Sequence, residues 1–170
     1  MTLNKTHFRY LLVVFFCAAI AGFSVMGFAG REAGAERASV PEVDSDADMV
    51  VYLSPFCGCC GDWVKHIEEH GLSVERREVS DVTPIKQAYG ITRELASCHT
   101  GIIDGYAIEG HVPAEDIKRL LEERPDVAGL TVPGMPIGSP GMEVEGVAPD
   151  AYDVLTFDRD GTTAVFASHN

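Results

Sequence analysis

Short apolar runs, separated by turn residues, divide the chain beyond residue 48 into alternating predicted strands and helices. Residues 49–53 (MVVYL) are rich in Val and Tyr and predict a buried strand. Residues 62–69 place Trp63, Val64 and Ile67 on one helical face, and Gly71 follows, which predicts a helix that ends there. The same patterns predict a strand over residues 72–79, a helix over 83–89 with Thr83 as N-cap, strands over 101–103 and 106–109 joined by Asp104-Gly105, and a helix over 113–123.

This order of strand, helix, strand, helix, hairpin and helix is typical of the thioredoxin/glutaredoxin fold. We therefore predict an α/β domain over residues 49–170, with a central sheet and flanking helices. Residues 131–141 (TVPGMPIGSPG) are rich in proline and glycine and predict a loop. The runs at 151–157 and 163–167 flank the turn sequence DRDG and predict a closing hairpin, so that loop and hairpin form a C-terminal extension.

The first 29 residues have the pattern of a secretory signal peptide. Lys5, His7 and Arg9 precede an uncharged apolar run at residues 10–29, which ends in the small-x-small sequence Gly27-Phe28-Ala29. This run is also long enough to be an uncleaved membrane anchor. Residues 30–48 are rich in Ala, Ser and charged residues and predict a flexible linker. We expect a periplasmic, exported domain that is released by cleavage near residue 29 or else held at the membrane.

The charge of the chain argues against a nucleic-acid partner. The 13 Lys and Arg residues face 26 Asp and Glu residues, which gives a net charge of −13. Cleavage after residue 29 would remove Lys5 and Arg9 and no acid, leaving 11 basic against 26 acidic residues, or −15. Nucleic-acid binding needs clustered Lys and Arg to neutralise phosphates, and this composition does not supply them.

Cysteines are the strongest chemical signal in the chain. Cys57, Cys59 and Cys60 lie in SPFCGCCGDW, between the first predicted strand and the first predicted helix. Cys57 and Cys60 have the C-x-x-C spacing of a redox pair, and Cys59 adds a third sulfur to the same turn. Cys98 precedes the predicted hairpin, where thioredoxin-like folds place a cis-proline against the active-site turn, so we expect it to face the motif. Metal binding, disulfide exchange by Cys57 and Cys60, and two structural disulfides all remain open.

The third cysteine favours metal binding over the other two functions. Soft thiolates select Cu(I), zinc or iron–sulfur clusters. Adjacent Cys59 and Cys60 do not readily turn to one ion, which disfavours a mononuclear zinc site, and the usual iron–sulfur spacings are absent. Thiolates can bridge, so the cysteines could hold several Cu(I) ions. Four residues could add ligands or hydrogen bonds to such a centre: Met135, Met142, His99 and His111.

His66 and His70 are spaced i, i+4 on the first predicted helix. This spacing can bind zinc, but the pair ends the helix, where a histidine suits the helix dipole. We therefore interpret the two histidines as helix-end residues. We interpret Trp63 as a core residue.

With these residues in view, the chain resembles the CopG-type family of exported copper-resistance proteins. The matching stretches are SPFCGCCGDWVKH, ELASCHT, YAIEGHVPAEDIKRLL and VPGMPIGSPGME, which together span roughly residues 50–142. The resemblance implies a thioredoxin-like fold and a cysteine-bridged multinuclear copper site at Cys57, Cys59, Cys60 and Cys98. It also implies copper ions, and other periplasmic copper-handling proteins, as candidate partners.

Two functions from different classes follow. The first is a periplasmic copper-binding protein in copper resistance or homeostasis, which holds Cu(I) as a multinuclear cluster and is not a classical enzyme, although copper redox activity stays open. The alternative is a thiol–disulfide oxidoreductase that uses the Cys57/Cys60 pair. The additional cysteine in the motif, and a cysteine where an oxidoreductase keeps its cis-proline, favour the first.

Overall fold

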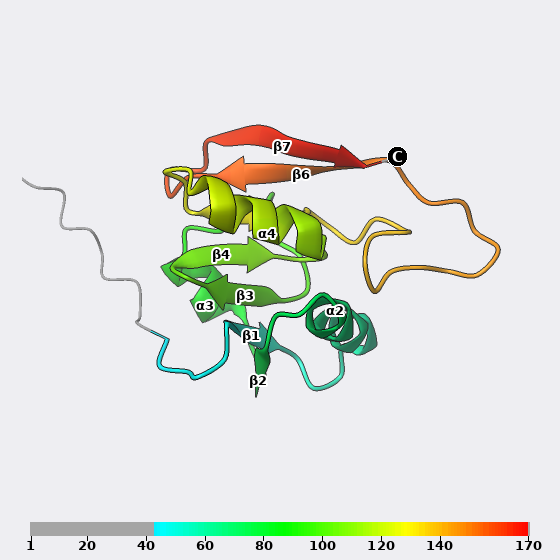
Figure 1. Cartoon of the computed structure of the whole chain (residues 1–170), viewed down its shortest axis with the longest axis horizontal. Coiled ribbons are helices and arrows are strands. Elements are labelled where there is room, and N and C mark those ends of the chain that lie inside the picture. Colours follow the sequence, from blue (N-terminus) through cyan, green and yellow to red (C-terminus); the bar gives the residue numbers. More distant parts are fainter. Residues whose placement is uncertain (1–42, 170) are drawn as a thin grey trace, which may run out of the picture. The chain divides into compact units, whose positions relative to one another are not determined.

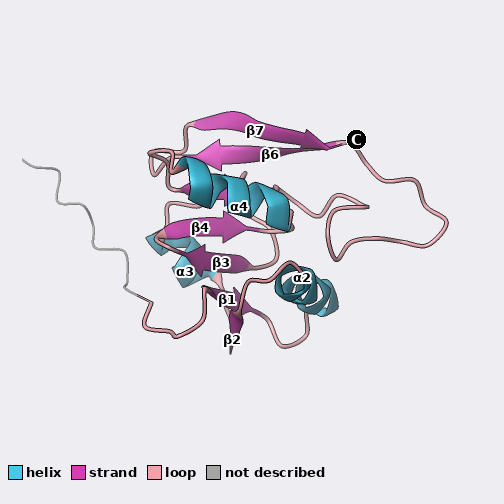
Figure 2. Cartoon of the chain, in the orientation of Figure 1, coloured by secondary structure: helices cyan, strands magenta, loops and turns pink. Residues whose placement is uncertain are grey.

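The computed structural model describes residues 43–169, so the predicted signal segment and most of the predicted linker lie outside the described residues. The described chain forms a seven-stranded mixed sheet in the order β2-β1-β3-β4-β5-β6-β7 (Figure 1). The strands are β1 (Met49–Leu53), β2 (Val74–Glu78), β3 (Thr100–Ile103), β4 (Tyr106–Glu109), β5 (Gly129–Thr131), β6 (Tyr152–Phe157) and β7 (Thr163–His169). The helices of this part are α2 (Gly58–Glu69), α3 (Thr83–Ala88) and α4 (Ala114–Glu123) (Figure 2).

The first four strands form the predicted thioredoxin-like unit. β1 and β2 are parallel, with α2 as the crossover between them, and β3 runs antiparallel to β1. β3 and β4 pair as an antiparallel hairpin. Asp104 and Gly105 at its tip both have positive φ, 49° and 83°, as the two-residue turn requires. The predicted order of elements and the predicted hairpin are confirmed.

The helices cover the sheet on both faces and bury two apolar clusters. Neighbouring strand residues point to opposite faces, so Ile103 belongs to one cluster and Ile102 to the other. The larger cluster joins β1 to α2 and α4 through side chains such as Leu53, Trp63, Ile67, Ile117 and Leu120. The smaller cluster lies on the face of α3 and contains Tyr89, Ile91, Leu95, Ala107 and Phe157. Figure 1 shows α4 and α3 on opposite sides of the central strands.

The C-terminal extension continues the same sheet. β5 pairs with β4 in parallel, β6 with β5 in antiparallel, and β6 and β7 form the predicted closing hairpin. β5 was not predicted, and Thr131, which we assigned to the loop, is its last residue. Three residues that begin with glycine give too short a pattern to reveal a strand, and β5 forms because two neighbouring strands supply its hydrogen-bond partners.

The helix N-termini also differ from the prediction, and α4 begins at Ala114 rather than at residue 113. α2 begins at Gly58 rather than Asp62, with Cys57 as its N-cap residue, so Cys59 and Cys60 lie in its first turn. The N-cap of α3 is Val82 rather than Thr83. The side chain of Thr83 does not cap the helix. Instead the carboxylate of Asp81 accepts the backbone N–H of Thr83, the first residue of α3, at 2.9 Å. Within residues 43–169, no helix is long and apolar enough to cross a membrane.

The contact between β4 and β5 gives a sharp test of the extended sheet. A Cβ atom at Gly129 would lie 1.8 Å from the carbonyl oxygen of Ala107, which forces the two strands apart. We expect Gly129→Ala to lower the free energy of unfolding by about 3 kcal/mol in a denaturant titration. Gly61→Ala is the control, since its Cβ would meet no atom closer than 4.0 Å and alanine suits a helix. Equal stability of the two variants would contradict this register of β5.

Candidate metal centre

The first part of the site is the start of α2. Cys57 and Cys59 are partly exposed there, whereas Cys60 is fully buried in the larger apolar cluster. A disulfide joins Cys57 to Cys60. The free sulfur of Cys59 lies 3.5 Å from that of Cys57, so all three sulfurs of the motif share one turn. The first turn of a helix offers unpaired N–H groups and a positive dipole end, which stabilise thiolates.

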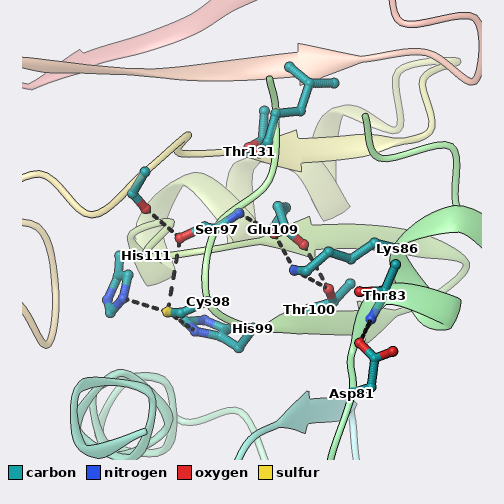
Figure 3. A network of polar contacts seen from close by, with 12 residues as sticks. Asp81, Thr83, Lys86, Ser97, Cys98, His99, Thr100, Glu109, His111 and Thr131 are labelled. Atoms are coloured by element: carbon teal, nitrogen blue, oxygen red, sulfur yellow. Dashed lines mark hydrogen bonds and ion pairs between the residues drawn. The ribbon is translucent and has the colours of Figure 1, made fainter. Parts of the chain in front are cut away.

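The second part is the loop that carries Cys98, and a buried carboxylate holds it in place (Figure 3). Glu109 on β4 is fully buried and accepts hydrogen bonds from the backbone N–H of Ser97, the ammonium of Lys86 and the hydroxyl of Thr100. Burial raises the pKa of Glu109, and Lys86 opposes that shift. The carboxylate thus ties the loop at residue 97 to both α3 and the sheet.

A third segment closes over the start of α2. A Cβ atom at Gly141 would lie 2.7 Å from the backbone nitrogen of Trp63 and 2.8 Å from the carbonyl oxygen of Cys59. Gly141 also has a positive φ of 81°, so glycine is required there for two reasons. The loop that the sequence predicted over residues 131–141 therefore packs directly on the cysteine motif.

These three segments bring the predicted cysteines together. The sulfur atoms of Cys57, Cys59, Cys60 and Cys98 all lie within 4.8 Å of one another. Cys98 therefore faces the motif, as its place in the thioredoxin-like order predicted. The role of the four cysteines as metal ligands stays a prediction.

Two histidines approach Cys98 from different elements. The Cys98 sulfur lies 3.2 Å from Nδ1 of His99 and 3.2 Å from Nε2 of His111. Nδ1 of His111 donates to the carbonyl oxygen of Pro140 at 2.8 Å, so its Nε2 carries a lone pair directed at the sulfur. The Cys98 thiol therefore donates a hydrogen bond to Nε2 of His111 and accepts one from Nδ1 of His99. Nε2 of His99 is then a buried acceptor that meets no partner among the described residues.

The electrostatics of this group keep it uncharged. Burial, together with the nearby Cys59, raises the pKa of the Cys98 thiol to about 11. Burial holds the pKa of His99 well below 6.5, and His111 and Lys86 lower it further. Burial also lowers the pKa of His111. The two imidazoles are therefore neutral and the thiol is protonated. In this state the imidazole lone pairs are available to a metal ion, and an ion that binds Cys98 must displace only the thiol proton.

The remaining predicted residues lie at the edge of this arrangement. Met135 is half exposed and Met142 partly buried on the loop that packs on α2, and a ligand role for either stays a prediction. Trp63 is fully buried and donates from its indole nitrogen to the carbonyl oxygen of Val112 at 2.8 Å, which confirms it as a core residue. The centroid of its ring lies 4.3 Å from the ring centroid of His99. Lys86 and Glu109 were not predicted as part of the site, because Glu109 is the last residue of β4 and no local pattern marks either side chain as buried.

Residues 95–142 match the family DUF411, described as a protein of unknown function. Two solved structures match, both of the copper resistance protein CopG. The first is 46% identical with a TM-score of 0.67, and covers 71% of this chain and 95% of its own. The second is 44% identical with a TM-score of 0.68, and covers 74% of this chain and 100% of its own. The chain belongs to the CopG family. No curated protein matches it significantly.

The family assignment confirms the resemblance found in the sequence. The matched DUF411 segment contains Cys98, His99 and His111 but not the motif at residues 57–60. The two CopG structures cover nearly all of their own length in the alignment, so the similarity is not confined to that segment.

The buried histidine gives the metal-free protein a defined pH dependence. Unfolded chains protonate histidine near pH 6.5, whereas folded His99 stays neutral well below that pH. The free energy of unfolding is therefore unaffected by His99 above pH 6.5. Below that pH it falls by about 1.4 kcal/mol per pH unit, because the unfolded chain binds a proton at this histidine and the folded chain does not. We expect urea titrations between pH 7 and pH 5 to show this loss, and His99→Gln to show a smaller slope. The same slope in both proteins would contradict the buried, neutral state of His99.

Proposed function

We propose that this protein binds copper in the periplasm and contributes to copper resistance, with Cys57, Cys59, Cys60 and Cys98 as the ligands. The observation that carries the proposal is the convergence of four sulfur atoms within 4.8 Å, from two segments far apart in the sequence. Membership of the CopG family supports copper as the metal, since the two similar structures are described as copper resistance proteins. The signal-like segment at residues 1–29 supports export.

The oxidation state that suits this donor set is Cu(I). Thiolates are soft ligands and Cu(I) is the soft ion among the candidate metals. Cys59 and Cys60 are adjacent, which favours bridging between several ions over a single tetrahedral ion. Cu(I) binding by all four cysteines requires the Cys57–Cys60 disulfide to be reduced to two thiols. We therefore propose that the reduced protein holds a multinuclear Cu(I) cluster, with His99 and His111 adding nitrogen ligands or hydrogen bonds.

The disulfide also suggests how copper redox chemistry could occur at the site. Oxidation of the Cys57 and Cys60 thiols by two Cu(II) ions yields one disulfide, two Cu(I) ions and two protons. Cys59 and Cys98 remain as thiols in that state, as they do in the structure. Both lie within 4.8 Å of the disulfide sulfurs, so the Cu(I) formed would meet free thiols at once.

Two features favour the alternative, thiol–disulfide exchange. The Cys57–Cys60 disulfide lies at the start of a helix, and Phe56 beside it is 95% exposed, as a substrate-docking residue would be. Two observations oppose it. The Cys59 sulfur lies 3.5 Å from Cys57 and competes with any substrate thiol, and Cys98 occupies the place across from the motif. We therefore rank exchange second.

Copper stoichiometry tests the cluster. The reduced protein should bind more than one Cu(I) per chain, with thiolate-to-copper absorption in the ultraviolet, in an anaerobic titration against a Cu(I) chelator. Cys98→Ser should lower stoichiometry or affinity about as much as Cys59→Ser, because both sulfurs belong to the same group. Ser168→Ala, on the distant β7, is the control. Parental binding by Cys98→Ser would remove this sulfur from the site, and one zinc bound in preference to copper would exclude a Cu(I) cluster.

Insulin reduction separates copper binding from thiol exchange. We expect slow turnover by the metal-free protein, because Cys59 competes with substrate, and slower turnover after Cu(I) is added, because copper occupies the same thiolates. A dedicated thioredoxin measured in parallel sets the scale. Rapid turnover that depends on Cys57 and Cys60, and is unchanged in Cys59→Ser and Cys98→Ser, would establish the alternative function.

A further inference from the structure

A second group of metal-binding side chains lies outside the cysteine centre, at the other end of α2. It consists of His66 on α2, His70 at the C-cap of α2 and Glu115 on the first turn of α4, with one ligand atom of each within 4.8 Å of the others. The sequence places these residues on two helices separated by more than forty positions, and the fold brings the helices together. The two histidines, which we interpreted from the sequence as helix-end residues, are thus joined by a carboxylate from another helix.

The hydrogen bonds of His70 leave one of its nitrogens directed at that carboxylate. Nδ1 of His70 lies 2.6 Å from the carbonyl oxygen of His66, which only accepts, so Nδ1 carries the proton. In the neutral ring, Nε2 therefore has a lone pair. It lies 3.3 Å from a carboxylate oxygen of Glu115, so two acceptors face one another. A cation between them, or a proton on the ring, is needed to make this contact favourable.

The spacing of the two acceptors fits a metal ion. Ligand atoms bound at about 2.0–2.1 Å lie about 2.9 Å apart at neighbouring corners of a square plane, the Cu(II) preference, and about 3.3 Å apart in a tetrahedron, the Zn(II) preference. The contact between His70 and Glu115, at 3.3 Å, equals the tetrahedral separation, and a shift of a few tenths of an ångström in the exposed Glu115 side chain gives the Cu(II) separation. The ring of His66 lies beside that of His70, with centroids 4.2 Å apart and the ring planes tilted by 43°. Its Nε2 accepts the backbone N–H of Ala114 at 3.1 Å, so His66 would join the ion by exchanging that amide for the metal.

The surroundings of the group attract cations. A cavity of about 270 Å³ opens beside His66 and is lined by Asp62, Glu69 and Glu143, with Lys65 as its basic residue. Lys65 is paired with Glu69 at 3.7 Å, so the cavity keeps an excess of negative charge. Burial lowers the pKa of His66, and His70 lowers it further, which keeps the His66 ring neutral and able to bind a metal.

We propose that His66, His70 and Glu115 form a second metal site, which binds a divalent transition-metal ion and prefers Cu(II) to Zn(II). Two imidazoles and a carboxylate are borderline ligands that suit both ions, and Cu(II) binds such a set more tightly. The site differs in kind from the thiolate centre, which suits Cu(I). It does not depend on the cysteines, so the proposal stands or falls separately from the function proposed above.

The test uses the untagged protein with Cys59→Ser and Cys98→Ser, which keeps the Cys57–Cys60 disulfide and has no free thiol at the centre to reduce Cu(II) or bind Zn(II). Titration with Cu(II), followed by electron paramagnetic resonance, should show one bound ion per chain with nitrogen and oxygen ligands. His70→Gln and Glu115→Gln, added to this background, should each weaken binding at least tenfold, and His66→Gln should weaken it several-fold. Glu122→Gln, an exposed glutamate later on α4, should bind like the background protein.

Imidazole nitrogen spectra recorded during a Zn(II) titration identify the ligands directly. We expect the ring signals of His66 and His70 to shift, and those of His99, His111 and His169 to stay in place. Binding that survives both His70→Gln and Glu115→Gln would overturn the proposal. So would shifts at His99 and His111, or at His169, whose Nε2 lies 2.7 Å from Asp116. Absence of any bound Cu(II) would also overturn it.

Discussion

The carboxylate of Glu109 is the constraint on which the arrangement of the site depends. It is fully buried, and it joins the sheet, α3 and the loop of Cys98 through three donors (Figure 3). Burial of a charge is costly unless the charge is paired and hydrogen bonded, and here both conditions are met. A less costly apolar contact would fill the same volume but would not fix the direction of a backbone N–H group. The carboxylate sets the position of residue 97 and, one residue later, the position of the sulfur that faces α2.

Local signals were sufficient to predict the thioredoxin-like half of the fold. Asp104-Gly105 fixes its hairpin through the φ angles that these residues adopt, and the Trp63, Val64 and Ile67 pattern fixes the buried face of α2. β5 escaped prediction because its stability comes from strands on either side rather than from its own three residues. The placement of Cys98 was predictable only through the order of the elements, since no local pattern links it to a motif some forty residues earlier.

The polar part of the site was less predictable, for a physical reason. Lys86 and Glu109 look like a surface lysine and an exposed strand residue in the sequence, and only the packing of α3 against the sheet turns them into a buried pair. The contact of His70 with Glu115 likewise depends on the angle between two helices. Sequence periodicity reports which face of an element is apolar, whereas the partners of individual polar groups depend on tertiary geometry. The redox state of the cysteine motif is likewise not predictable from the sequence. The spacing of Cys57 and Cys60 permits a disulfide, a thiolate pair or a bridged cluster, and the redox surroundings select among them.

The packing of Trp63 against His99 gives this protein an intrinsic fluorescent probe. The chain contains a single tryptophan, its indole is fully buried, and its ring lies 4.3 Å from an imidazole that touches the Cys98 sulfur. All tryptophan emission therefore originates beside the cysteine group, with no background from a second indole. Occupancy and redox state of that group can be followed by fluorescence in the unlabelled chain, in real time and at low concentration.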